Sequence, residues 1–109
     1  MRRLLLALAL VSILAAIGAT VALARTSAVS LGDNFFSKGT VKIRRGSAVH
    51  WHWSKTRNAH NVTGTTKGAR FHSATGHTGG LTHTFNKPGT YRFICTRHPT
   101  QMVMTVKVT

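Results

Sequence analysis

The fold is decided by the stretch Cys95-Thr96-Arg97-His98-Pro99-Thr100-Gln101-Met102, close to the end of a chain of 109 residues. It places a thiol, an imidazole and a thioether within eight consecutive residues, and a second imidazole, His60, lies upstream. A thiolate, two imidazoles and a weakly bound thioether are the ligands of one kind of copper centre in proteins. The stretch therefore predicts that these four side chains meet at a metal ion.

The residues around Cys95 indicate how the chain could bring these ligands together. Residues 91–95 have the alternation of a strand that ends at Cys95, with the thiol facing the core. Pro99 turns the chain directly after His98, because its ring fixes φ and removes a backbone donor. We therefore expect the loop to fold back so that Cys95, His98 and Met102 converge.

Each of these side chains also has an ordinary structural interpretation. Cys95 could be an inert buried thiol, Met102 part of the core, and His98 a surface histidine. Their combination at this spacing favours a metal, and the softness of the set favours copper over harder ions. Zinc usually takes four strong ligands, and methionine is not one of them. The sequence thus predicts one copper ion per chain, bound by His60, Cys95, His98 and Met102.

The rest of the chain predicts short strands and turns rather than helices. Alternating apolar positions, typical of half-buried strands, occur at residues 29–31, 41–43, 49–53, 81–85, 91–95 and 104–108, with a short apolar patch at Val62. About seven short strands are typical of an antiparallel β-sandwich or a small barrel. Residues 63–80 are rich in Gly, Thr and Ser, and we expect a long loop with one extra edge strand there.

The first residues have the organisation of an export signal. Arg2 and Arg3 precede an apolar run over residues 4–17, and residues 22–24 form a small-residue cleavage box, Ala-Leu-Ala. This pattern predicts a signal peptide over residues 1–24.

Cleavage there would leave residues 25–109 as one small domain. The alternative is an uncleaved anchor, because residues 4–24 come close to the roughly 20 residues that cross a bilayer. The two arginines favour the inner side of the membrane, so both interpretations place the domain in the periplasm, the cell wall or the extracellular space. Membrane contact is expected only through residues 4–24, if they are retained.

The charge is strongly one-sided. Lys and Arg number 15 and Asp33 is the only acidic residue, which gives a net charge of +14. Such a surface attracts anions, so we expect an acidic partner protein or an anionic surface or polymer, and no nucleic acid for an exported chain. Cys95 is the only cysteine, and an exported lone thiol needs an occupant such as a metal.

The sequence resembles the cupredoxins, a family of small blue copper proteins that includes plastocyanin, pseudoazurin and amicyanin. The matching stretches cover nearly all of residues 27–109, and they are residues 33–36, 41–53, 60–62 and 88–99, together with Met102. The resemblance implies an all-β, Greek-key β-sandwich that holds a type 1 copper ion near one end.

The resemblance also implies roles for individual residues. His60, Cys95 and His98 would be the strong equatorial ligands, and Met102 the long axial one. Asn61 resembles the residue that ties the two ligand loops together by hydrogen bonds. Met104 is an alternative axial ligand, although its position favours the core.

Five further histidines have no place in this ligand set. His50 and His52 are expected on a solvated strand face, and His83 to be partly buried with a hydrogen bond. His72 and His77 lie in the glycine-rich loop, where a secondary copper site is an alternative.

The function implied is that of a monomeric one-electron carrier between redox partners, with the exposed edge of His98 as the port, and not an enzyme. One alternative is a copper carrier or scavenger with the same ligands. A nucleophile formed by Cys95 and His98 lacks a third residue and an oxyanion donor. A basic adhesive module with a structural metal is the remaining alternative.

Overall fold

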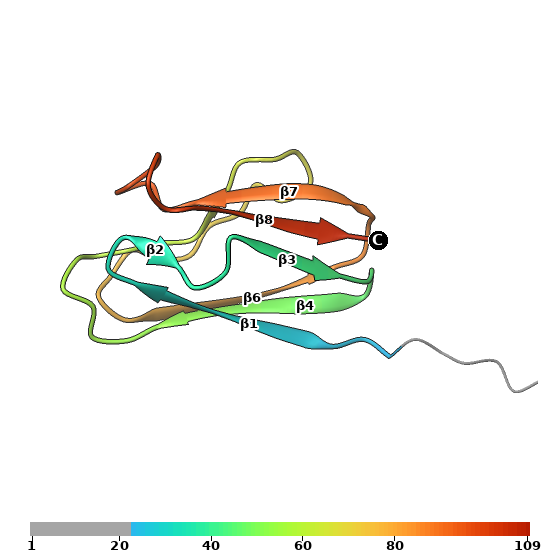
Figure 1. The fold of residues 1–109 in the computed structure, drawn as a ribbon, viewed down its shortest axis with the longest axis horizontal. Coiled ribbons are helices and arrows are strands. Elements are labelled where there is room, and N and C mark those ends of the chain that lie inside the picture. The colour runs from blue at the N-terminus through green and yellow to red at the C-terminus, as the bar shows by residue number, and fades with distance from the viewer. Residues whose placement is uncertain (1–22) are drawn as a thin grey trace, which may run out of the picture.

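The computed structural model describes residues 23–109, and eight strands within them form two four-stranded sheets (Figure 1). The first sheet has the order β2-β1-β4-β6 and consists of β1 (Thr26–Gly32), β2 (Phe35–Phe36), β4 (Ser47–Trp53) and β6 (Gly79–Phe85). The second has the order β3-β8-β7-β5 and consists of β3 (Thr40–Ile43), β5 (Thr63–Gly64), β7 (Gly89–Ile94) and β8 (Val103–Val108). The predicted all-β sandwich is confirmed.

The sheets are mixed rather than purely antiparallel, which refines the prediction. β1 pairs with β4 in parallel, and β3 pairs with β8 in parallel, while the remaining pairs are antiparallel. Between β1 and β4 the chain visits the other sheet through β3, and it then returns in its original direction. Parallel strands need such a crossover, whereas a short hairpin always gives an antiparallel pair.

The core lies between the two sheets and is built from alternate residues of each strand. Val49, Trp51 and Trp53 of β4 are buried, and the Trp51 ring packs 4.8 Å from that of Phe93 in β7. His50 and His52 lie on the opposite, outer face of β4, as predicted. The side-chain period of two therefore separates core from surface along this strand.

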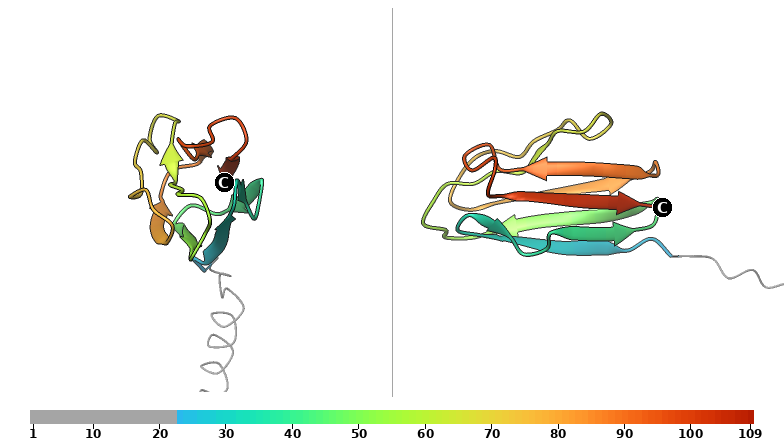
Figure 2. Two further views of the ribbon diagram at one scale, coloured as in Figure 1. Left: turned by 90° about the vertical axis from the view of Figure 1, so that its left-hand side faces the viewer. Right: turned by 45° about the horizontal axis from the view of Figure 1, so that its top comes forward.

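The strand ends gather the candidate ligands at one end of the sandwich. β7 leads into Cys95, β8 starts directly after Met102, and the loop before β5 carries His60. These loops lie together with β2 at the left of Figure 1, and the left panel of Figure 2 looks onto this end. We refer to it as the ligand end.

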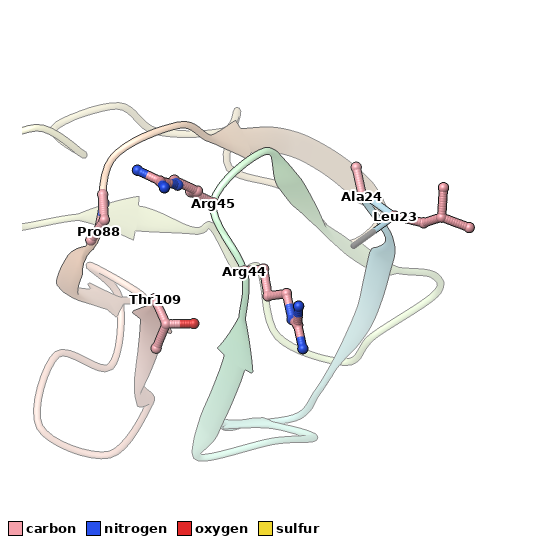
Figure 3. Close-up of a pocket in the computed structure, with 6 residues that line it drawn as sticks. All are labelled: Leu23, Ala24, Arg44, Arg45, Pro88 and Thr109. Atoms are coloured by element: carbon pink, nitrogen blue, oxygen red, sulfur yellow. The ribbon is translucent and has the colours of Figure 1, made fainter. Parts of the chain in front are cut away.

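The chain enters the domain and finishes at the opposite end. A pocket there is lined by Leu23, Ala24, Arg44, Arg45, Pro88 and Thr109 (Figure 3). No predicted ligand lines this pocket. The predicted signal or anchor segment, residues 1–24, lies outside the described residues except for its last two.

Residues 23–109 contain no helix that is long and apolar enough to span a membrane.

Candidate metal centre

Cys95 and Met102 are held together by the backbone of the loop that joins β7 to β8. The N–H of Cys95 donates to the carbonyl oxygen of Met102 at 3.1 Å, and the N–H of Met102 donates to that of His98 at 2.9 Å. The N–H of His98 in turn donates to the carbonyl oxygen of Cys95 at 3.1 Å. The loop therefore folds back as predicted, and the side chains of Cys95 and Met102 are fully buried.

His60 brings its ring to the thiol from another loop. Its side chain is fully buried, and Nδ1 lies 4.0 Å from Cys95 Sγ. Thiolate and imidazole ligands bind a transition-metal ion at about 2.3 and 2.0–2.1 Å, so two donors of one ion can lie up to about 4.4 Å apart. The observed separation is within that limit, and these two donors therefore fit a shared metal ion.

His98 lies next to His60 and has an unsatisfied nitrogen. The two ring centroids are 5.3 Å apart, and His98 Nε2 is buried without a hydrogen-bond partner among residues 23–109. A buried polar atom without a partner is rare in folded proteins, and a bound metal is one explanation for it.

The structure does not present a closed triad of strong donors. Within residues 23–109, no three or more His, Cys, Asp or Glu side chains are arranged so that they could hold a metal ion as they stand. His60 is close to Cys95 and also close to His98, but the three side chains do not converge on one point.

The two buried methionines have different neighbours. Met104 Sδ accepts a hydrogen bond from the indole N–H of Trp51 at 3.1 Å, so this sulfur is engaged in the core. Met102 has no such bond among the described residues and sits in the loop that carries Cys95 and His98. Of the two sulfur atoms, that of Met102 is therefore the one left without a hydrogen bond among the described residues.

Asn61 ties the two ligand loops together, as the resemblance implied. Its backbone N–H points at Cys95 Sγ, 3.4 Å away, and its Oδ1 accepts the N–H of Thr96 at 3.1 Å. Its Nδ2 donates to the hydroxyls of Thr96 and Thr75 at 2.7 and 2.9 Å, and Thr63 Oγ1 donates to its Oδ1 at 2.9 Å. This buried network fixes the sulfur relative to the His60 loop.

Asp33 is the site residue that sequence reasoning missed. Its Oδ1 lies 3.1 Å from His60 Nε2, and its carboxylate also accepts the backbone N–H groups of Asn58 at 2.8 Å and Arg57 at 2.9 Å. The N–H groups of Asn58 and Arg57, helped by His60, lower the pKa of Asp33 from 3.8 to about 2. Its being the only acidic residue was the available signal, but the sequence did not show what it contacts.

The other histidines lie outside this cluster. His50 Nδ1 is 2.6 Å from Thr82 Oγ1, and His72 and His77 each face a different backbone carbonyl at 3.0 Å. His83 is partly buried, as predicted, but it stacks on Phe71 at a centroid distance of 4.2 Å. No hydrogen bond from its ring to another residue is found within residues 23–109, so that part of the expectation stays a prediction.

Comparison with known proteins also indicates a copper-binding protein. The family described as copper binding proteins, plastocyanin/azurin family, matches residues 24–109. No curated protein sequence matches the chain.

Several solved structures share the fold. A purple cupredoxin from Nitrosopumilus maritimus is 23% identical with a TM-score of 0.64, covering 76% of this chain and 99% of that one. An oxidised mutant of amicyanin is 22% identical with a TM-score of 0.67, covering 77% and 82%. A copper-containing nitrite reductase from Thermus scotoductus is 23% identical with a TM-score of 0.64, covering 85% of this chain but only 24% of that one. At these identities the likeness concerns the fold alone.

Proposed function

Because the chain belongs to the plastocyanin/azurin family of copper-binding proteins, copper is its metal, and we propose that it is an exported one-electron carrier. One ion per chain would be held by His60, Cys95, His98 and Met102. The observation that carries this proposal is the fully buried Cys95 thiol. Its Sγ lies 4.0 Å from His60 Nδ1 and accepts a hydrogen bond from the Asn61 N–H. When bound, copper supplies the couple between Cu(I) and Cu(II).

The protein itself excludes water from the ligand atoms and restrains their positions. Three of the four candidate ligands are buried, and the Asn61 network restrains the loops that carry them. Electron transfer is favoured when ligands move little between oxidation states, and hydrogen bonds to the ligand sulfur tune the potential. Of the four, only His98 is partly exposed, so we propose that electrons leave through its edge.

The charge suggests the partner. Arg97, next to His98, is exposed, and the whole chain carries a single carboxylate side chain. Such a surface steers an acidic redox partner by long-range attraction. We propose export through residues 1–24, with a retained anchor as the alternative.

Copper storage or delivery is the competing function with the same ligands. A delivery site needs donors that an acceptor can reach, because metal transfer between proteins proceeds by ligand exchange. The burial of His60, Cys95 and Met102 disfavours it. We also propose that the chain is not an enzyme, since an electron carrier of this family binds copper and transforms no substrate.

The test is a visible absorption titration of the reduced protein with Cu(II). We expect an intense thiolate-to-copper band that saturates at one equivalent and is absent in Cys95→Ser and His60→Ala. His77→Ala, which removes a surface histidine, is the matched control and should keep the band. A colourless protein, or copper binding that Cys95→Ser leaves unchanged, would refute the site.

Voltammetry of the copper-loaded protein, with and without an added copper chelator, separates the two functions. An electron carrier gives a reversible one-electron wave and keeps its copper. A delivery protein loses its copper to the chelator before the ion can be reduced and reoxidised. An irreversible wave with rapid copper release would support delivery.

A further inference from the structure

The only carboxylate side chain of a highly cationic protein is bonded to a candidate copper ligand. Fifteen Lys and Arg residues are present, but within residues 23–109 none of their side chains pairs with Asp33, whose Oδ1 lies 3.1 Å from His60 Nε2. If Asp33 served only to balance charge, a lysine or arginine side chain would be the expected partner. Its actual partners are an imidazole and two backbone N–H groups.

The carboxylate determines which nitrogen of His60 carries the proton. An ionised carboxylate can only accept hydrogen bonds, so Nε2 must be the donor in this pair. In a neutral imidazole the other nitrogen, Nδ1, then holds the lone pair. That nitrogen is the one that lies 4.0 Å from Cys95 Sγ.

The carboxylate is itself held in place by the backbone. Asp33 occupies the turn between β1 and β2, where Asn34 adopts a left-handed conformation with a φ of 72°. Asn58 donates to this turn twice, from its N–H to Asp33 at 2.8 Å and from its Nδ2 to Asn34 Oδ1 at 3.2 Å. The acceptor is thus positioned before any metal binds.

We propose that Asp33 is a positioning residue of the copper centre, which orients His60 and stabilises the oxidised ion. This inference rests on the proposed function. Cu(II) carries one more positive charge than Cu(I), so a fixed negative charge behind a ligand favours Cu(II) and lowers the reduction potential. Carboxylates that accept from metal-bound histidines affect metal affinity by about 10–100-fold.

The test is Asp33→Asn in the full chain, which removes the charge and keeps an oxygen acceptor. Thr90→Lys, at an exposed position of β7, is the matched control because it changes the net charge by the same amount. We expect Asp33→Asn to keep the blue band and to weaken Cu(II) binding about tenfold relative to Cu(I). For a one-electron couple this equals a rise of about 59 mV in the potential. Thr90→Lys should leave the potential unchanged.

Equal shifts in the two variants, or none in Asp33→Asn, would overturn the proposal while the band still supports the copper site. A second measurement needs no copper: nitrogen-15 NMR of the metal-free protein reports the His60 tautomer. We expect the proton on Nε2 in the wild type and both tautomers in Asp33→Ala. A proton on Nδ1 in the wild type would refute the positioning role, whatever the copper titration shows.

Discussion

At the scale of single residues, Met102 and Met104 are two positions apart and both buried, yet their sulfur atoms have different environments. We expect Met104→Leu to cost about 1–3 kcal/mol of unfolding free energy, because the Trp51 indole N–H loses its acceptor. Met102→Leu should change the reduction potential and cost less than about 1.5 kcal/mol in the metal-free protein. Urea unfolding and voltammetry measure the two effects. A potential shift in Met104→Leu alone would reverse the axial assignment.

Asn61 concentrates several hydrogen bonds in one buried side chain. Asn61→Ala removes four hydrogen bonds, to the hydroxyls of Thr63, Thr75 and Thr96 and to the Thr96 N–H, and each contributes about 0.5–1.5 kcal/mol. We therefore expect at least about 2 kcal/mol of lost stability in urea unfolding of the metal-free protein. Thr65→Ala removes only an exposed contact of 3.4 Å and serves as the control. Similar losses in both variants would mean that the network contributes little.

At the scale of elements, β5 depends on Gly64, whose backbone lies close against the backbone carbonyl of Ala69. A Cβ built on Gly64 would lie only 1.6 Å from the carbonyl oxygen of Ala69, so the chain must move to accept it. We expect Gly64→Ala to cost at least about 1–3 kcal/mol, as overpacking does. A Cβ on Gly39 meets nothing within 4 Å, and Gly39→Ala should stay within about 0.5 kcal/mol of wild type. Equal thermal stability of the two variants would contradict this packing.

β6 carries a histidine whose burial opposes protonation. Desolvation lowers the pKa of His83 from 6.5, and its ring stacks on Phe71. Below pH 6.5 the unfolded chain takes up this proton before the folded protein does, so stability present above pH 6.5 is lost as the pH falls through the folded value. We expect His83→Phe to lose less unfolding free energy than wild type between about pH 7 and pH 5, a range that includes the ordinary histidine pKa of about 6.5. Equal losses in chemical unfolding would contradict this.

The sequence predicted some elements better than others, for physical reasons. β3, β4, β6 and β8 follow the alternation of apolar side chains, because their inner faces are buried against the opposite sheet. β2 was missed, since it has only two residues and Phe35 is 53% exposed. Alternation carries no direction, so the parallel pairs could not be predicted. The contact of Asp33 with His60 depends on how a turn docks onto a loop 27 positions away, which no local pattern records.

At the scale of the whole molecule, the sandwich separates two ends with different roles. The ligand end holds His60, Cys95 and His98, while the chain enters and leaves at the other end, beside Arg44 and Arg45 (Figures 1 and 3). If residues 4–24 were retained as an anchor, the ligand end would lie at the end of the domain away from the point of attachment. Whether residues 4–24 are cleaved or retained, the partly exposed edge of His98 therefore lies away from the point where they join the domain.

Placement of the electron port at the ligand end can be tested by charge reversal. Arg97→Glu and Arg44→Glu change the net charge equally, but Arg97 adjoins His98 and Arg44 lies at the opposite end. Because exposed charges are screened over about 10 Å at 0.1 M salt, the local charge matters more than the total at moderate ionic strength. With an anionic small-molecule oxidant, stopped-flow rates of the reduced wild type should fall as salt rises. We expect Arg97→Glu to lower the rate severalfold more than Arg44→Glu and to weaken the salt dependence.

Equal effects of the two charge reversals would mean that only the total charge steers the oxidant. A larger effect of Arg44→Glu would place the site of electron exit at the other end of the sandwich.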